Sequence, residues 1–343
     1  MSTVSYALRG DPKIPAHTAQ RLRAIAARLG YSANPAVSAL MAHIRTGRQP
    51  KRGGVLAFVW IDKPRSAPGS AFDCQSIAGV RERAAEQGFG IEEFHLADAG
   101  MNARRLSGIL KARGIAGVIF SGCESRTDVR IEMDWSAHAT AIIGNAGWEP
   151  ELHRAAYHHF LNMRRALLEL AARGYRRPAA WLELMVNERA HRAWEGAFLA
   201  FHPNPDKARS FMQTFGEVDL RGTARWLKAC RPDAIILTKA AFAESIRPLL
   251  AGIRPAPGLV VLDLTGATLP LAGIDPGVRF VAANAVDLVT EQLYRNERGL
   301  SAAPKKLLFE GRWREGKSLR PPIAMTAVQS TVSPTGALRN SRG

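Results

Sequence analysis

GVLAFVW, residues 54–60, is a short apolar run in which no polar residues alternate with the apolar ones. Runs of this kind are typical of strands that are buried on both faces of a parallel sheet. A helical pattern at 77–87 follows and ends before Gly88, and a second strand is expected near Ile91. The order strand, helix, strand predicts an α/β fold in which helices cover a parallel sheet.

The same alternation continues through the chain in two sets. The first set is completed by one helix and two strands, at 103–113, 115–120 and 140–144. A helix at 161–173 leads to the second set, which contains a helix at 193–201 and four strands, at 179–184, 210–215, 234–237 and 259–263. Two successive sets of strands predict a core of two lobes, each with its own sheet.

Positive charge is concentrated at the start of the chain. The whole sequence has 47 Lys and Arg against 30 Asp and Glu, a formal net charge of +17, and residues 1–54 contain a single acidic residue, Asp11. A local surplus of cations suits a polyanion, because neutralising phosphates releases condensed counterions. A generally arginine-rich composition is the plainer explanation, since net charge informs on association and not on fold.

The basic segment also has a helical pattern. Apolar side chains recur at i, i+3, i+4 and i+7 between residues 22 and 29, which predicts an amphipathic helix at 16–29 that stops at Gly30. Asn34 is a good N-cap and Pro35 suits the first position of a second helix, which continues over 36–44. Two short helices next to a basic linker predict a small module ahead of the core.

Four pieces of sequence in one order carry a family resemblance: STVSYAL (2–8), the join GY-x-x-NP (30–35), AVSALMAHIRTGR (36–48), and AGIDPGVRFVAANAVDLVTEQLYRNERG (272–299) followed by LLFEGRWREGKSLR (307–320). Over Ser2 to Arg320 the chain resembles the LacI/GalR-type transcriptional regulators. The resemblance implies a two-lobed core like that of periplasmic binding proteins, preceded by an all-α helix-turn-helix headpiece and a hinge helix.

The expected boundaries follow from the pattern and the resemblance together. We expect a headpiece at 1–33, a hinge helix and linker at 34–53, the core at 54–322 and a tail at 323–343. The tail is rich in Ser, Thr and Gly without periodicity, so it is expected to be disordered. The family headpiece begins with a further helix, which this sequence starts too late to contain. We expect a start upstream of Met1; the alternative is a protein that binds DNA poorly.

The resemblance assigns DNA contacts to the headpiece. It places Ser2 and Tyr6 where the family reads base edges, and Thr3 and Ser5 where it bonds phosphates. The alternative is that the hydroxyl groups only cap a helix.

Asn34 and Leu40 are the remaining two residues that we expect to contact DNA. The resemblance places Leu40 where the hinge helix inserts a leucine into the minor groove and kinks the duplex. Plain packing of an apolar stripe is the alternative reading of Leu40. A single short helix is unstable alone in water, however, so we expect the hinge helix to order on DNA beside its twofold mate.

Ligand contacts are expected at the carboxyl ends of the strands, where open α/β sheets bind small molecules. Five polar side chains follow predicted strands: Asp62, Glu124, Asn145, Lys239 and Asp263. The resemblance assigns ligand contacts to Asn145 and Asp263. These positions predict an effector site between the two lobes.

Three positions depart from the family pattern. Lys239 and Ala240 stand where the family often has an Asn-Asp pair. When Phe198 is aligned with the aromatic residue of the family, Trp194 falls where the family has its pocket arginine, and Arg192 lies two residues earlier. Our hypothesis is that Lys239 favours an acidic or phosphorylated sugar over a neutral one. The alternative is that Lys239 points to solvent.

The sequence favours neither a metal site nor an enzyme. The three cysteines have no C-x-x-C spacing, and His153, His158 and His159 lack a Cys or acidic partner at ligand spacing, so we interpret them as a polar loop that leads into a helix. No G-x-S-x-G turn or phosphate-binding Gly-rich loop occurs. We therefore expect no catalytic residue, no cofactor and no metal.

The sequence thus predicts a cytoplasmic, homodimeric, ligand-responsive regulator, most simply a repressor, that binds a palindromic operator in double-stranded DNA and a sugar-like effector. It lacks a long uninterrupted apolar stretch, so no contact with a membrane is expected. Two other classes stay open: a small-molecule binding protein that has lost DNA binding, and an enzyme with a similar two-lobed body.

Overall fold

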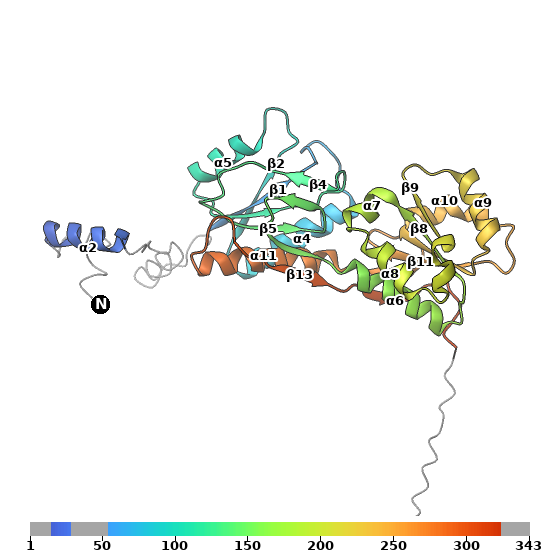
Figure 1. The fold of residues 1–343 in the computed structure, drawn as a ribbon. Coiled ribbons are helices and arrows are strands. Elements are labelled where there is room, and N and C mark those ends of the chain that lie inside the picture. Colours follow the sequence, from blue (N-terminus) through green and yellow to red (C-terminus); the bar gives the residue numbers. More distant parts are fainter. Residues whose placement is uncertain (1–14, 29–53, 324–343) are drawn as a thin grey trace, which may run out of the picture.

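The structure, a computed structural model, describes residues 15–28 and 54–323 (Figure 1). Helix α2 spans Ala16–Arg28, as the apolar spacing predicts. The remaining described residues form an α/β core with two sheets of six strands each and a small third sheet. The residues expected to contact DNA lie outside the described residues; they are Ser2, Thr3, Ser5, Tyr6, Asn34 and Leu40. The same is true of nearly all of the predicted tail.

The first lobe is built on a parallel sheet in the order β13-β7-β5-β3-β1-β2. Its strands are β1 (Val55–Trp60), β2 (Gly90–His95), β3 (Gly117–Phe120), β5 (Ala139–Ile143), β7 (His153–Tyr157) and β13 (Lys306–Phe309). Helices α4 (Ala71–Glu86) and α11 (Val278–Tyr294) pack on one face, and α5 (Ala103–Ala112) packs on the other. A short parallel pair, β4 (Asp128–Arg130) and β6 (Gly147–Glu149), lies beside this sheet.

The second lobe repeats this plan with the order β14-β12-β11-β10-β8-β9, in which only β14 is antiparallel. Its strands are β8 (Pro178–Glu183), β9 (Met212–Phe215), β10 (Ala234–Lys239), β11 (Gly258–Asp263), β12 (Ala272–Asp275) and β14 (Arg312–Arg314). Two helices, α6 (His159–Ala172) and α8 (Ala193–Phe201), pack on one face. Two others, α9 (Leu220–Cys230) and α10 (Ala241–Leu250), pack on the opposite face. Two short helices, α7 (Leu184–Arg189) and the 3-10 helix η1 (Pro205–Phe211), connect these elements.

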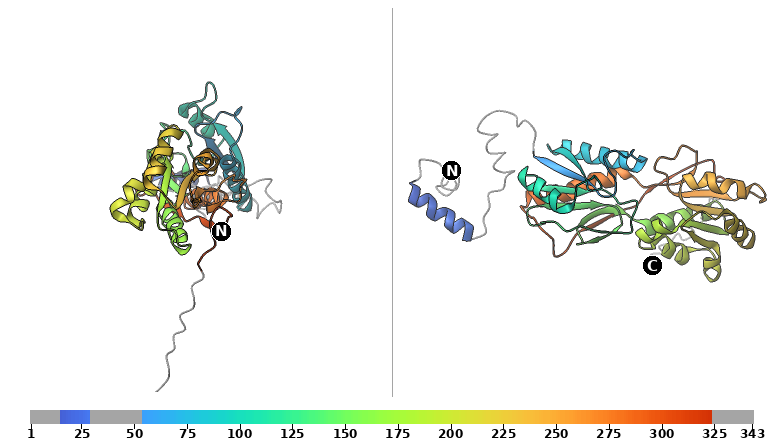
Figure 2. Two further views of the ribbon diagram at one scale, coloured as in Figure 1. Left: turned by 90° about the vertical axis from the view of Figure 1, so that its right-hand side faces the viewer. Right: turned by 90° about the horizontal axis from the view of Figure 1, so that it is seen from above.

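The chain passes between the lobes three times, at 157–159, 275–278 and 309–312. In consequence the C-terminal segments, orange and red in Figures 1 and 2, contribute to both lobes: α11 and β13 to the first, β12 and β14 to the second. The lobes lie side by side, joined by these three short connections.

Helix α4 shows how a local signal can be missed. It begins at Ser70, whose hydroxyl accepts a hydrogen bond from the Asp73 N–H while the Asp73 carboxylate accepts one from the Ser70 N–H. This capping box satisfies two of the free N–H groups of the first turn. The predicted helix at 77–87 therefore starts six residues too late.

The interpretation of the histidine cluster was wrong for His153. This residue is buried within β7, an interior strand of the first sheet, and not in a loop. His158 and His159 do lead into a helix, because the His158 side chain caps α6 and His159 is its first residue. The strand was missed because the sequence HRAAY contains two charged or polar residues and only three apolar or aromatic ones.

Candidate functional site

A cavity lies where the carboxyl ends of the strands in the two lobes face each other. It contains about 590 Å³ of space unfilled by protein atoms, part of it open to solvent. The first lobe lines it with Phe72, Gly122, Cys123, Glu124, Gly144, Asn145, Tyr157 and, at the crossover, His159; the second lobe with Val186, Arg189, Trp194, Thr238, Lys239 and Asp263.

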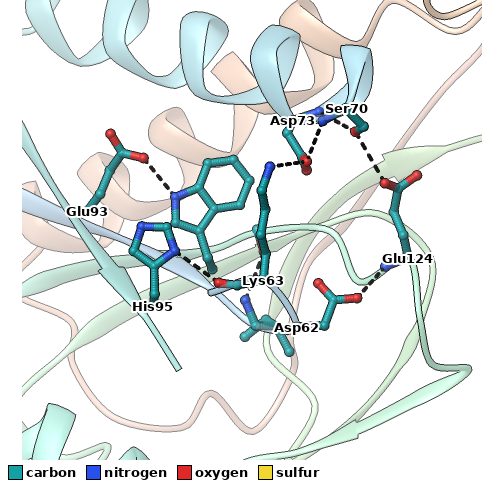
Figure 3. Close-up of polar contacts among 10 residues, drawn as sticks. Asp62, Lys63, Ser70, Asp73, Glu93, His95 and Glu124 are labelled. Atoms are coloured by element: carbon teal, nitrogen blue, oxygen red, sulfur yellow. Dashed lines mark hydrogen bonds and ion pairs between the residues drawn. The ribbon is translucent and has the colours of Figure 1, made fainter. Parts of the chain in front are cut away.

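Asp62 supports the cavity wall from behind and is not among the lining residues. Its Oδ2 accepts hydrogen bonds from the N–H groups of Glu124 (3.0 Å) and Ser125 (2.8 Å), and from the Cys123 thiol (3.4 Å). Burial raises the pKa of Asp62, but the hydrogen bonds from Ser125, Cys123 and Glu124 outweigh it and hold the pKa below its usual value. Asp62 thus fixes the loop that carries Glu124 (Figure 3).

Glu124 and Asn145 line the cavity in different ways. The Glu124 carboxylate accepts a hydrogen bond of 3.3 Å from the Ser70 hydroxyl at the start of α4. The Asn145 amide donates to the Tyr157 carbonyl oxygen (3.0 Å) and accepts from the Tyr157 N–H (3.1 Å). Because both ends of this amide are used, Asn145 mainly holds the end of β7, and Glu124 is the freer of the two.

Lys239 and Asp263 extend from neighbouring strands of the second lobe. Lys239 lines the cavity, but its Nζ lies 3.3 Å from Glu183 Oε2, so its charge is already compensated. Asp263 accepts a hydrogen bond from the Thr265 N–H (2.8 Å). Burial raises its pKa, although its bonds to Thr265 and the charge of Lys239 oppose the shift. The two predicted residues therefore share one wall, and Lys239 is not a free cation there.

The arginine of the cavity is Arg189, which the sequence analysis did not single out. It is the last residue of α7, and its Nη1 donates a hydrogen bond of 2.6 Å to the Glu124 carbonyl oxygen in the other lobe. Arg192, the predicted contact that lies two residues before Trp194, is exposed, pairs with Glu188 and Glu195, and does not line the cavity. The short helix α7 was not predicted, and without it the direction of Arg189 could not be foreseen.

Aromatic rings form a continuous wall at the crossover. The His159 ring lies 4.4 Å from the Trp194 ring and 5.9 Å from the Tyr157 ring, measured between centroids. Trp194 is buried, and it lines the cavity at the position that the register gives it. Such a wall can cover the face of a planar or ring-shaped ligand.

Comparison with known proteins gives matches by structure alone: no family model matches the chain, and no curated protein matches it. A complex of the transcriptional regulator CelR with cellobiose matches with a TM-score of 0.55 at 16% identity, over 92% of this chain and 95% of that one. The Lac repressor bound to ONPG in the repressed state matches with a TM-score of 0.53 at 15% identity, over 92% and 94%. A LacI-family regulator from Rhizobium etli gives 0.59 at 15% identity, over 77% and 98%.

The chain has the fold of the LacI-type regulators. The predicted fold class is therefore confirmed for the two-lobed core. In this LacI-type core the cavity occupies the crevice between the lobes, where the sequence placed the predicted ligand contacts.

Three polar groups that line the cavity lack a partner. Among the residues that the structure describes, the Tyr157 hydroxyl, the Trp194 indole N–H and the Thr238 hydroxyl are buried without a hydrogen bond. Buried polar groups are nearly always paired, so unpaired ones along a cavity are the groups that a ligand would satisfy. These three groups can therefore form hydrogen bonds with a ligand in the crevice.

In a second hollow, on the outside of the first lobe, the polar groups are paired with one another. Around Trp60, the indole N–H donates to Glu93 (2.7 Å) and Lys63 pairs with Asp73 at 2.6 Å (Figure 3). Arg81 pairs with the same Glu93 carboxylate. Because these charges are compensated within the protein, this hollow gives less reason to expect a ligand than the crevice does.

The part of the chain at 15–28 and 54–323 contains neither a metal-binding cluster nor a membrane-spanning helix. Within it, no group of three or more His, Cys, Asp or Glu side chains could hold a metal ion. No helix there combines the length and the apolar character that crossing a bilayer requires.

His159 should make folding stability depend on pH. Burial, with the charge of Arg189 and smaller effects of His158 and His191, lowers the pKa of His159 to about 3. Between about pH 6.5 and pH 3 the unfolded chain therefore binds a proton that the folded chain does not, so stability falls as the pH falls. Between pH 7 and pH 5 the loss should be about 2 kcal/mol.

Urea unfolding of the unmodified protein and of His159→Phe at both pH values measures this term. The other histidines are present in both proteins, so their effects cancel in the difference. The variant should lose about 2 kcal/mol less than the unmodified protein on acidification. Equal losses in the two proteins would mean that His159 is not held neutral by the fold.

Proposed function

We propose that this protein is a ligand-responsive, DNA-binding transcriptional regulator, a repressor, that works in the cytoplasm without catalysis. The observation that carries the proposal is the crevice of a LacI-type core, lined by an aromatic wall and by buried polar groups that lack partners. Regulators with this fold have been solved with cellobiose and with D-xylulofuranose. A sugar-like effector is therefore the ligand class we favour.

The contacts across the crevice suggest how a ligand would be sensed. Arg189 of the second lobe already bonds the Glu124 carbonyl of the first, so the two walls are within reach of each other. A ligand that bonds both walls favours the arrangement in which they are close. If that arrangement also sets the position of the segments before residue 54, ligand and DNA affinities are linked reciprocally.

The basic N-terminal segment supplies the DNA-binding part of the proposal. Ser2, Thr3, Ser5 and Tyr6 would contact the major groove and its phosphates, and the hinge segment with Asn34 and Leu40 would lie against the minor groove. Two copies related by a twofold axis would match the two halves of a palindromic operator, so we propose a homodimer.

The test is a measurement of DNA binding by the whole chain. A palindromic duplex should bind with steep salt dependence, losing about a thousandfold or more in affinity between 50 and 200 mM salt. Leu40→Ala should weaken binding roughly tenfold by removing the minor-groove wedge. A non-palindromic duplex of the same composition is the control.

Two outcomes would count against this function. Binding that is absent at low salt would favour the alternative, a small-molecule binding protein that has lost DNA binding. Equal affinity for the palindrome and its control would contradict sequence-specific binding. It would show only the general attraction of a basic protein to a polyanion.

A further inference from the structure

The crevice is lined by both acidic and cationic side chains. Next to Tyr157, the carboxylates of Asp263 and Glu124 both add to burial in raising the pKa of its phenol. At His159, the charge of the Arg189 guanidinium adds to burial in lowering the pKa of the imidazole. The cavity therefore presents both carboxylates that can accept hydrogen bonds and a guanidinium that can donate them.

The two cations of the crevice differ in what they can still bind. Lys239 has Glu183 as an ion-pair partner at 3.3 Å. Arg189 has no carboxylate within 4.0 Å among the described residues, and its one recorded hydrogen bond, from Nη1 to the Glu124 carbonyl oxygen, leaves most of its five N–H donors open. Arg189 is thus the cation that can take an anionic group from a ligand.

A second open donor lines the same cavity. The indole of Trp194 lines the cavity 4.4 Å from His159, and its N–H is buried without a partner among the described residues. A carboxylate has two acceptor oxygens in one plane and matches a guanidinium fork. It could accept from Arg189 and from the Trp194 N–H, whereas a single hydroxyl could satisfy these donors less completely.

We infer that the crevice selects a sugar acid, a polyhydroxy compound with one carboxylate, in which Arg189 binds the carboxylate and Asp263 and Glu124 accept hydrogen bonds from the hydroxyls. This inference rests on the proposed ligand-binding function and makes it more specific. In the hypothesis drawn from the sequence, Lys239 selects an anionic ligand. Here Arg189 has that role instead. A phosphate is disfavoured, because its second negative charge would enter a cavity that already holds two carboxyl groups.

The experiment compares matched ligands by isothermal titration calorimetry and thermal shift. The pairs are glucose with glucuronate and galactose with galacturonate, and glucose 6-phosphate serves as a second anion. At least one acid should bind roughly ten- to a hundredfold more tightly than its neutral partner, the range expected for hydrogen bonds to a charged group. Arg189→Met should remove that preference.

Two variants control for charge and for folding. Arg192→Met removes an arginine three residues away that does not line the cavity, so the preference should stay unchanged. Arg189→Lys keeps the charge but not the fork, and should retain part of the preference if Arg189→Met unfolds the protein.

The inference would be overturned by tighter binding of the neutral sugar or of the phosphate, by binding of none of the acids, or by an unchanged preference in Arg189→Met. Tight binding of a neutral sugar would overturn the sugar acid but leave the proposed regulator intact. Absence of operator binding by the whole chain would contradict the proposed regulator without affecting this ligand preference.

Discussion

Replacing Gly79 by alanine should destabilise the protein by about 2 to 3 kcal/mol, the range for forcing extra atoms into a filled core. Gly79 is buried in α4 where this helix crosses α11. A Cβ placed there would overlap the carbonyl oxygen of Arg279 and lie 2.9 Å from its Cα. Since the obstacle is backbone, the two helices would have to separate. Urea unfolding at pH 7 measures the loss, and Gly79→Val should lose more.

Gly108 in α5 is a matched control for this helix contact. A Cβ at Gly108 meets nothing within 4 Å. Because alanine forms helices better than glycine, Gly108→Ala should raise the stability of the protein by about 0.5 to 1 kcal/mol. The two glycine-to-alanine changes are thus expected to have opposite signs. A similar gain in stability from both substitutions would contradict the close contact between α4 and α11.

Replacing Arg173 by methionine should cost about 3 kcal/mol, because it removes the hydrogen bonds that its buried guanidinium donates to two carboxylates. The Arg173 side chain is 1% exposed, and it pairs at 2.6 Å with Glu169 and with Glu315. Its guanidinium also lies over the ring of Trp313. This arginine therefore ties the end of α6 to the segment at β14. Denaturant unfolding compared with the unmodified protein measures the cost.

Arg165 provides the control for Arg173, since it pairs with the same Glu169 carboxylate at 2.6 Å. Its side chain is 55% exposed, and exposed ion pairs contribute little. Arg165→Met should change stability by no more than about 0.5 kcal/mol. A cost at Arg165 equal to that at Arg173 would mean that burial is not what makes the Arg173 pairs strong.

The sequence predicted the parts of the fold whose residues are uniformly apolar. The strands at 55–60, 234–239 and 258–263 were located within two residues, because all are buried on both faces and contain hardly any polar residues. Strand β7 was missed for the opposite reason: it is fully buried yet contains His153 and Arg154, whose polar atoms find partners only in the folded chain. Tertiary contacts of this kind leave no periodic signal.

For the site, the sequence could predict which strand ends carry polar residues but not where the side chains point. Glu124, Trp194, Lys239 and Asp263 do line the crevice. The pairing of Lys239 with Glu183 depends on the register of β10 beside β8, and the inward position of Arg189 depends on α7; neither is encoded in local spacing. Direct ligand contact by any of these residues is still a prediction.

The three connections between the lobes bear on how the protein can unfold. Neither sheet is made from one continuous stretch of chain, because the edge strands β13 and β14 of the two sheets both lie within nine residues, 306–314. A cut anywhere upstream of residue 306 would thus leave each sheet without its last strand until the C-terminal piece returns. The core should accordingly melt as a single cooperative unit and not lobe by lobe, and its C-terminal segment should be among the last pieces that a nascent chain needs.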